Sequence, residues 1–585
     1  MVERVLITTA LEDTWPEYDI PVLFLGEWCK LYSSKDKWSK FDSIVVPYHW
    51  DDRAKLYEDY QYLTKLQEIL LKETVLKLNE VHCINKEEKY WKILISPWLN
   101  YFLEVIFDRW VMIDYALKNY NISEVNTLMK DANNAIPFDF SNFNSNVHTD
   151  TWNDIIYGDI LREIGSVPIK EIIRDEDIKG SSRIKGRVNL TSKIKGRLKT
   201  MVNWISSRLS SSDDFFLLAT YLPIKYEMAL QWSLGQVPKF WFEPEIQLNI
   251  NINSGLGRRL SVDSWKDRGF ENFARKLVFK YMPIVYLEGY GSLLKTVKKA
   301  SWPSAPKAIF TSNSIYANEV FKAWAAEKVC NGSPLIIGQH GGNYGASVIN
   351  YSEDHEIEIA DSFLSWGWDD PLKPNIIPMF NLKMVGKKSN WNPKGYLFLV
   401  TMSLPRYSYC LLSVPIASQF LNYLEDQCRF IEALSPSAKE KLLVRLFPKD
   451  NGWAQSDRYV EKFPWLKIDI SKTSIFDRMR DIRLYVSTYN ATTFLESLYL
   501  NIPTIMYWDF RFWEISQGAQ PYYDQLISSG ILHDSPESAA RKVEEIWHDV
   551  ELWWESQELQ TARKHFCSKF SREVDEPIRL LKELF

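Results

Sequence analysis

The sequence predicts an α/β protein made of two Rossmann-like, doubly wound domains that face each other across a cleft. Short apolar runs rich in β-branched residues alternate with segments of helical period, as expected for parallel strands joined by helices. A chain of 585 residues exceeds the size of a single hydrophobic core. A polar break, KKSNWNPKG, begins at Lys387 and separates two such alternating halves. We therefore expect an N-terminal domain over residues 1–385 and a C-terminal domain over residues 386–565.

The N-terminal domain is expected to combine a parallel sheet with an insertion of helices. Its predicted strands are short apolar runs: Val5–Thr9, Val22–Gly26, Ser43–Tyr48, Ala308–Ser312, Leu335–His340 and Phe363–Trp368. Residues 51–120 instead show a long helical period rich in aromatic side chains. We therefore expect a helical insertion over about residues 51–300.

The C-terminal domain is expected to begin with a new first strand after the polar break. Its predicted strands are Tyr396–Thr401, Leu442–Phe447, Leu466–Ile470, Leu484–Thr488 and Thr504–Trp508. The segments between them can hold helices, among them Pro415–Leu434 and Ile475–Arg480. Residues 535–585 are helical in period and charge pattern.

Composition indicates a multidomain globular protein. Hydrophobic residues make up 46% and charged residues 25%, close to the soluble average, while the aromatic share of 14% is high and suits stacking on sugars or bases. The net charge of −5 gives no general attraction to nucleic acid. Six cysteines lack paired spacing, the N-terminus lacks a signal-peptide pattern, and no run of 18 apolar residues occurs. We expect a cytoplasmic protein.

The segment Leu335–Trp368 carries the densest set of chemically active residues. A buried-strand pattern ends in Gly341, Gly342 and Gly345, which let the backbone turn sharply or approach a ligand closely. Seven titratable residues follow in quick succession: His340, Glu353, Asp354, His355, Glu356, Glu358 and Asp361. Open α/β sheets bind ligands at the carboxyl ends of their strands, so this segment predicts an active-site loop.

Two other interpretations of that segment stay open. Carboxylates are favoured near a helix N-terminus, so Glu353, Asp354 and Glu358 could simply begin a solvated helix. His340 and His355 could also join carboxylates as zinc ligands, although no HExxH or CxxC spacing is present. For His340, which follows a buried strand and precedes two glycines, we favour a functional role.

A second ligand signature lies in STYNATTFLESLYLNIPTIMYWD, Ser487–Asp509. A strand leads into a polar turn and then a helix, and the turn carries five hydrogen-bonding side chains: Ser487, Thr488, Asn490, Thr492 and Thr493. Hydroxyls and free amides at a helix N-terminus suit a phosphate, and ordinary capping explains only one hydroxyl. Glu496, one turn into the helix, could reach a ribose hydroxyl or simply favour the helix start.

Arg445 and Lys449 follow another predicted strand of the same domain and could aim positive charge at the same crevice. A surface ion pair with Asp450 or Asp457 is the alternative for them. No Walker A motif, GxGxxG or kinase catalytic loop is present, which argues against ATP hydrolysis and hydride transfer. These features predict a nucleotide mono- or diphosphate leaving group.

Two near-copies, SSRIKGRVN and TSKIKGRLK, form a basic stretch over Arg183–Lys199. A flexible linker is one interpretation. Contact with the anionic inner face of the cytoplasmic membrane, or with a phosphorylated acceptor, is the other.

Several long motifs resemble one family. They are LITTALEDTWP (Leu6–Pro16), PVLFLGEWC (Pro21–Cys29), ANEVFKAWAAEK (Ala317–Lys328), IIGQHGGNYG (Ile336–Gly345), EDHEIEIAD (Glu353–Asp361), SWGW (Ser365–Trp368), RLFPKDNGW (Arg445–Trp453) and TYNATTFLESLYLNIPT (Thr488–Thr504). They resemble bacterial surface-glycan transferases of the GT-B fold, similar to capsule-type enzymes that transfer nonulosonic acids, notably pseudaminic acid, from a CMP-sugar with retention. The resemblance implies an acceptor-binding N-terminal domain, a C-terminal domain that binds the nucleotide sugar, and a final helix over residues 566–585 that crosses back.

The resemblance also implies roles for individual residues. It places CMP against Thr488, Asn490, Thr492, Thr493 and Glu496, with the donor near Gly341 and Gly342. Many CMP-sugar transferases have a His-Pro pair where this chain has Phe447-Pro448, which shifts the phosphate role to Arg445 or Lys449. Retention calls for a carboxylate nucleophile or a same-face internal return, and the candidate carboxylates are Glu27, Glu356 and Asp361. His340 would act as acid/base or bind the donor carboxylate, and no metal is expected.

Other functions remain open at this point. A GT-B phosphotransferase could use a CDP-linked polyol, and another GT-B enzyme could use a different nucleotide sugar, as a UDP-sugar epimerase does. A non-catalytic glycan-assembly scaffold is the alternative outside enzymology, although a scaffold would not need a phosphate-binding turn.

Overall fold

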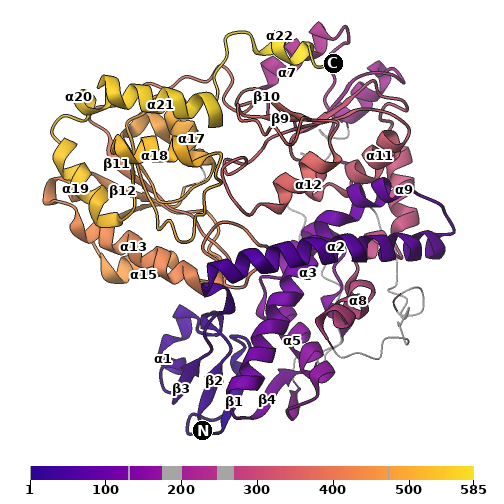
Figure 1. The fold of residues 1–585 in the computed structure, drawn as a ribbon, viewed down its shortest axis with the longest axis vertical. Helices are drawn as coiled ribbons and strands as arrows, with labels where there is room; N and C mark the ends of the chain where they lie inside the picture. The colour runs from indigo at the N-terminus through magenta and orange to yellow at the C-terminus, as the bar shows by residue number, and fades with distance from the viewer. Residues whose placement is uncertain (1, 130–131, 174–200, 247–257, 259–268, 472) are drawn as a thin grey trace.

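The computed structural model describes residues 2–129, 132–173, 201–246, 258, 269–471 and 473–585. Within them the chain forms three parallel sheets, two in the N-terminal part and one in the C-terminal part (Figure 1). The basic stretch Arg183–Lys199 lies outside the described residues. No described helix is long and apolar enough to cross a membrane.

The first sheet has the strand order β3-β2-β1-β4-β5. Its strands are β1 (Arg4–Ile7), β2 (Val22–Phe24), β3 (Ser43–Val45), β4 (Ile122–Leu128) and β5 (Ile169–Ile172). Every neighbouring pair is parallel, with Val5 opposite Val22 in β2 and Leu6 opposite Val125 in β4. This sheet forms the lobe at the bottom of Figure 1.

Two long helices lie between the first sheet and the rest of the molecule. The side chain of Asp52 caps the start of α2 (Arg53–His82) by accepting from the backbone N–H groups of Ala54 and Lys55. Helix α3 (Glu88–Asn119) packs against α2, α5 (Asp150–Ile164) and α11 (Glu319–Cys330). Because α3 is apolar around most of its circumference, it can be buried by these partners on several sides.

The second sheet has the order β10-β9-β8-β7-β6 and is again fully parallel. Its strands are β6 (Phe216–Leu217), β7 (Ile309–Thr311), β8 (Leu335–Gly338), β9 (Ser362–Ser365) and β10 (Ile376–Pro378).

The N-terminal part therefore differs from the expected single sheet with a helical insertion over residues 51–300. That range also contributes strands β4, β5 and β6, and the predicted strands divide between two sheets. Strand β4 mixes polar and apolar residues in ISEVNTL and buries only its second half, so it lacks the apolar run by which the other strands are recognised.

The third sheet has the order β13-β12-β11-β14-β15-β16, which is the 3-2-1-4-5-6 order of a Rossmann domain. Its strands are β11 (Tyr396–Val400), β12 (Leu442–Arg445), β13 (Lys467–Asp469), β14 (Ile482–Ser487), β15 (Thr504–Tyr507) and β16 (Leu532–His533). All five predicted strands of this domain are present. The predicted α/β class with parallel sheets is confirmed, and a Rossmann domain set against further parallel α/β units is a GT-B-like arrangement.

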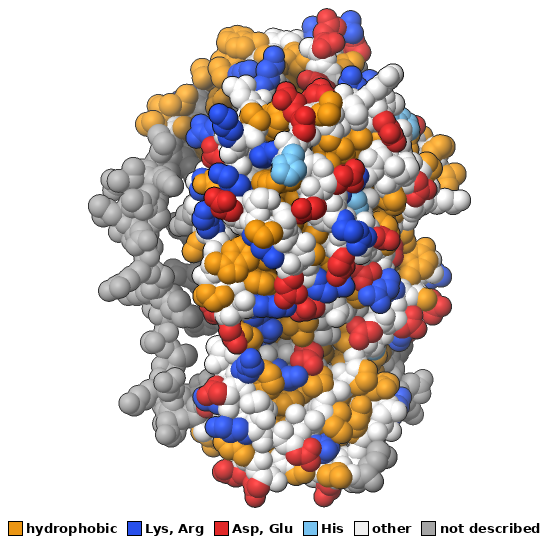
Figure 2. Space-filling view, turned by 90° about the vertical axis from the view of Figure 1, so that its left-hand side faces the viewer, with side chains coloured by type: hydrophobic (Ala, Val, Ile, Leu, Met, Phe, Trp, Pro, Cys, Tyr) orange, Lys and Arg blue, Asp and Glu red, His pale blue; other side chains and the backbone are white. Residues whose placement is uncertain are grey.

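Helices cover the faces of the three sheets. Further α-helices in the described part of the chain are α1 (Lys35–Trp38), α4 (Phe140–Asn146), α7 (Ile224–Ser233), α8 (Phe270–Tyr281), α9 (Tyr290–Lys299), α10 (Ser314–Ala317), α12 (Tyr351–Ile359), α13 (Phe420–Ala433), α14 (Pro436–Lys441), α15 (Gln455–Lys462), α16 (Ile475–Arg478), α17 (Thr492–Tyr499), α18 (Gln520–Ser528), α19 (Pro536–Ile546), α20 (Val550–Trp554), α21 (Gln557–Phe570) and α22 (Pro577–Lys582), and residues 201–209 are also helical. On the face shown in Figure 2, acidic and basic side chains are interspersed, in keeping with the small net charge.

The end of the chain returns from the third sheet to the second. Helix α21 packs on α17 and α18, and then Arg572 donates its N–H to the carbonyl of Trp366 at 2.9 Å and accepts from Asn381 at 3.0 Å. Helix α22 packs on α7 at the top of Figure 1, where Leu581 joins the apolar cluster of the second sheet. The C-terminal segment thus ties two sheets together.

A buried ionic network joins α3 to the loop that follows β11. The Arg109 guanidinium pairs with Asp108, donates to Asn153 Oδ1 at 2.9 Å, and donates to the carbonyl of Ser408 at 2.8 Å. Burial alone would raise the pKa of Asp108, but Arg109 and His49 lower it below its ordinary value. Arg109 therefore compensates a buried negative charge and also holds a loop of the C-terminal domain.

We expect Arg109→Met to lower the free energy of unfolding by about 3–5 kcal/mol, because it leaves the Asp108 carboxylate buried without its partner. The first urea transition, followed by circular dichroism, measures this loss. Arg579→Met is the matched control, since the Arg579 side chain is 67% exposed and should give no measurable change. Equal midpoints for the two variants would contradict the assignment.

Candidate active site

The loop after β8 meets the first turn of α17. The Gly342 N–H donates to Thr492 Oγ1 at 3.1 Å, joining the two motifs that the sequence analysis singled out separately. A Cβ atom at position 342 would lie 2.5 Å from the carbonyl oxygen of Ala491, so only glycine permits this approach. The carboxyl edge of the second sheet is thereby placed against the helix that follows β14 of the third.

Gln339 holds this loop in place. Its buried side chain donates to the carbonyl of Gly341 at 2.7 Å and accepts from the Trp366 N–H and the Trp368 indole, each at 2.8 Å. Gln339 is a site residue that the sequence motifs did not indicate. A polar residue directly after a buried strand is the signal that could have found it.

His340 lies beside a buried carboxylate on α12. Its Nδ1 is 3.5 Å from Glu356 Oε1, while the Tyr344 hydroxyl donates to Glu356 Oε2 at 3.1 Å. Burial disfavours the charged imidazolium, but Glu356 outweighs this and raises the pKa of His340 above its ordinary value. The ring of Tyr221, from the loop after β6, meets His340 edge-on. Glu356 thus favours an imidazolium, held in an ion pair, at the carboxyl end of β8.

Glu353, one turn before Glu356, is a second unusual carboxyl group. Its Oε2 accepts the Gly345 N–H at 2.8 Å, and burial raises its pKa to about 8. Gly345 has a φ of +70° and packs against the Trp368 ring, where no side chain would fit. Glu353 therefore carries a proton at neutral pH in a position that shapes the glycine turn.

The polar turn before α17 is held by its own side chains. Thr488 donates to the carbonyl of Val400 at 2.8 Å, and Asn490 Oδ1 accepts from the Tyr523 hydroxyl at 2.8 Å. The Thr493 and Tyr489 hydroxyls are 2.8 Å apart. These side chains position the turn, and Ala491, the N-cap residue of α17, provides no side-chain cap. The first-turn amides of α17 are the groups that suit an anion.

Charged side chains also gather on the side of α17 that faces the second sheet. Buried Glu496 pairs with Lys383, which is 42% exposed and follows β10. Burial lowers the pKa of nearby Lys387, although Glu496 opposes the shift. The negative charge of Glu496 is thus balanced, and Lys383 brings a cation to the junction.

Two predicted donor-binding cations lie elsewhere. Arg445 is buried and bound to Asp469 at 2.8 Å, to Ser471 at 2.9 Å and to the carbonyl of Thr473 at 2.7 Å, so its charge supports the edge of the third sheet. Lys449 is exposed and lies on the side of His148, whose pKa falls to about 4 through burial and the charge of Lys449. Neither contacts the junction of His340 and α17.

Two predicted carboxylates are also separated from His340. Asp361 accepts the Leu335 N–H at 2.8 Å, at the amino end of β8, whereas His340 follows its carboxyl end. Asp361 therefore lies at the opposite edge of the sheet. Glu27 pairs with Lys30 at 2.9 Å and lines a cavity of about 200 Å³ between the lobe of the first sheet and the C-terminal domain. Glu356 is the predicted carboxylate that the structure brings to His340.

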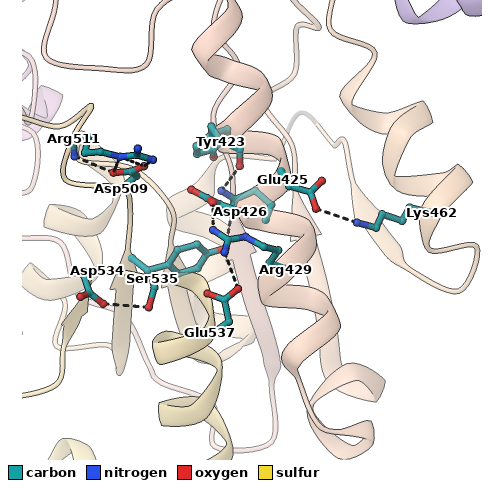
Figure 3. Close-up of polar contacts among 12 residues, drawn as sticks. Tyr423, Glu425, Asp426, Arg429, Lys462, Asp509, Arg511, Asp534, Ser535 and Glu537 are labelled. Carbon is teal, nitrogen blue, oxygen red and sulfur yellow. Dashed lines mark hydrogen bonds and ion pairs between the residues drawn. The ribbon is translucent and has the colours of Figure 1, made fainter. Parts of the chain in front are cut away.

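A different polar cavity, of about 350 Å³, lies at the carboxyl ends of β15 and β16 (Figure 3). There Arg429 bridges Asp426 at 2.6 Å and Glu537 at 2.9 Å, while Arg511 pairs with Asp509. Because acidic partners neutralise both arginines, this cavity is less suited to a phosphate than the start of α17. Within the described residues, no cluster of three or more His, Cys, Asp or Glu side chains is arranged to hold a metal, and His340 and His355 are not brought together as ligands.

Parallel sheets with GT-B-like pairing and a junction built from their carboxyl edges define this protein as an α/β protein of GT-B-like fold. More particularly, the chain belongs to the LIC12162 family of transferases, whose family model matches residues 4–585. No curated protein matches the sequence.

Two solved structures show distant similarity. Acinetobacter baumannii MurG aligns with a TM-score of 0.31 and 10% identity over 66% of this chain and 94% of MurG. The S. aureus MnaA–UDP co-structure aligns with a TM-score of 0.33 and 11% identity over 62% of this chain and 100% of MnaA.

We expect Gly342→Ala to loosen the junction, because the added methyl group would meet the backbone of Ala491 at 2.5 Å. A forced shift of this kind costs about 1–3 kcal/mol. Hydrogen exchange should rise at residues 339–345 and 489–496. Gly518→Ala is the control, since a Cβ there meets nothing within 4 Å. Unchanged exchange in Gly342→Ala would refute the close contact.

The His340 imidazolium should persist above the ordinary histidine pKa of about 6.5. Glu356→Gln removes the stabilising carboxylate but leaves the burial, so the pKa should fall below the ordinary value. The raised pKa stabilises the fold at low pH, and this contribution is lost as pH rises through the folded-state pKa. NMR titration of labelled histidines measures both values. Glu358→Gln, on the exposed side of α12, should leave them unchanged.

Proposed function

We propose that this transferase is a glycosyltransferase that moves a nonulosonic acid, similar to pseudaminic acid, from a CMP-activated donor to a surface-glycan acceptor with retention of configuration. The observation that carries the proposal is the contact of the Gly342 loop with the uncapped start of α17, beside the His340–Glu356 pair. The choice of CMP rests on the motif resemblance of both segments to CMP-nonulosonate transferases.

The donor phosphate would lie at the first turn of α17. Amides at a helix N-terminus bind phosphate oxygens, and the positive end of the helix dipole favours the negative charge. Lys383 adds a cation on the same side, close to Glu496. In this arrangement the Thr492 hydroxyl holds the Gly342 loop next to the phosphate. Thr488 and Asn490 fix the turn through their hydrogen bonds to Val400 and Tyr523.

His340 would supply the positive charge beside the sugar. A nonulosonic acid carries a carboxylate at its anomeric carbon, and an imidazolium can bind that group or donate a proton to the departing phosphate. Buried Glu356 acts as a positioning residue that favours the protonated form of His340. Because the Glu356 side chain is only 3% exposed and occupied by His340 and Tyr344, a same-face internal return suits this site better than attack by Glu356.

Calorimetry with CMP, CDP, UDP and ADP tests the proposal. CMP should bind most tightly, and Thr492→Ala/Thr493→Ala should weaken it about tenfold or more by disturbing the loop and the first turn of α17. Thr561→Ala is the control, because the Thr561 hydroxyl only donates to a carbonyl within α21.

Each outcome has a distinct meaning. Preference for UDP or CDP would contradict the CMP-sugar donor while leaving the phosphate site intact. Equal loss in the α17 and Thr561 variants would contradict the location of the phosphate. Binding of none of the four nucleotides would contradict the proposed function.

A further inference from the structure

The helix over residues 201–209 exposes its apolar side chains to solvent, unlike an ordinary surface helix. Its large apolar side chains face solvent: Met201 is 52% exposed, Trp204 59%, Ile205 43% and Leu209 52%. Their spacing of three and four residues places them along one face. Ser206, in contrast, is buried. A soluble surface helix normally directs its apolar stripe toward the core.

Polar contacts fix this orientation. The Asn203 side chain both donates to the Phe242 carbonyl at 2.9 Å and accepts the Phe242 N–H at 2.8 Å. Ser206 makes the same pair of contacts with the Phe240 backbone, at 2.7 and 3.1 Å. Turning the apolar face inward would break all four hydrogen bonds. The outward face is therefore built into the fold.

Helix α7 carries a second exposed apolar stripe. Ile224 is 65% exposed, Met228 38% and Trp232 60%, at a spacing of four residues that places them on one face. The opposite side of α7 packs on α22, and its Gln231 side chain bonds the backbone of Lys239. The backbone of residues 239–242, which binds the helix over residues 201–209, thus also binds α7.

This exposure is concentrated, not scattered. Of the 28 large hydrophobic side chains exposed among the described residues, eight lie between positions 201 and 237. Single exposed apolar residues need no explanation, but a cluster of this density marks an interaction surface. We name the exposed side chains of residues 201–209 and α7 the apolar surface.

The charge of the surrounding chain selects the partner. Among the described residues, Arg208 lies over the Trp204 ring at 5.6 Å, and Lys225 adjoins Ile224 on α7. Tryptophan and aliphatic side chains next to basic residues are typical of segments that lie in the interface of an anionic bilayer.

We propose that the apolar surface inserts into the headgroup region of an anionic lipid bilayer and docks the protein on it. Trp204 and Trp232 enter the interface, while Arg208 and Lys225 bind the lipid phosphates. This proposal does not depend on the identity of the sugar donor, because the apolar surface lies on different residues from the junction of His340 and α17.

Sedimentation with lipid vesicles tests the docking. The full-length protein should bind vesicles of equal parts phosphatidylcholine and phosphatidylglycerol, bind phosphatidylcholine alone much more weakly, and lose binding at high salt. Trp204→Ser with Trp232→Ser should weaken binding by about tenfold or more for each tryptophan. A second pair, Ile224→Ser with Met228→Ser, should weaken it in the same direction.

Leu372→Ser with Leu552→Ser is the matched control, because these side chains are 89% and 73% exposed at other places on the surface. This pair should bind vesicles as the unaltered protein does. Nucleotide calorimetry on every variant shows whether the fold and the junction are intact. That readout separates a failure of the docking proposal from a failure of the proposed function.

Three results would overturn the docking. One is an unaltered protein that ignores anionic vesicles. Another is full vesicle binding by both apolar-surface pairs. The third is an unaltered protein that self-associates but does not bind lipid, and whose self-association is lost in the Trp204→Ser/Trp232→Ser variant. That result would assign the apolar surface to contacts between copies of the chain.

Discussion

The candidate site depends on one short-range contact between backbones that are far apart in sequence. Gly342 and the start of α17 approach so closely that a single methyl group would separate them. The proposed site residues are all positioned relative to this contact. Gln339 and the indoles of Trp366 and Trp368 hold the Gly342 loop, and Thr488 and Asn490 hold the turn before α17. The chemistry is therefore a property of two sheets together.

Local pattern was sufficient to predict both halves of this contact. The end of a buried parallel strand followed by glycines, and a polar turn that begins a helix, are features that a few neighbouring residues determine. The C-terminal strands were predicted for the same reason, because each is a continuous apolar run. His340, Gly342 and Thr492 were selected from such patterns, and the structure brings them to one place.

What the sequence could not show is which segments become neighbours. Asp361 and Glu356 are close in the chain, yet Asp361 lies at the amino end of β8. Only Glu356 reaches His340 at the carboxyl end of that strand. Arg445 follows a strand at the expected edge, but Asp469 of the adjacent strand takes up its charge. The division of the N-terminal part into two sheets likewise depends on the packing of α2 and α3, and the sequence pattern of a strand does not predict that packing.

The return of the chain from α21 to the second sheet restricts how the molecule can move. The C-terminal domain is joined to the second sheet by the segment between β10 and β11 and again by the segment after α21, and the Arg109 network binds its loop after β11 to α3. These attachments restrict sliding and twisting of the C-terminal domain relative to the second sheet. Any motion that opens the junction has to separate Gly342 from α17, and closing it remakes the contact that holds the proposed phosphate site.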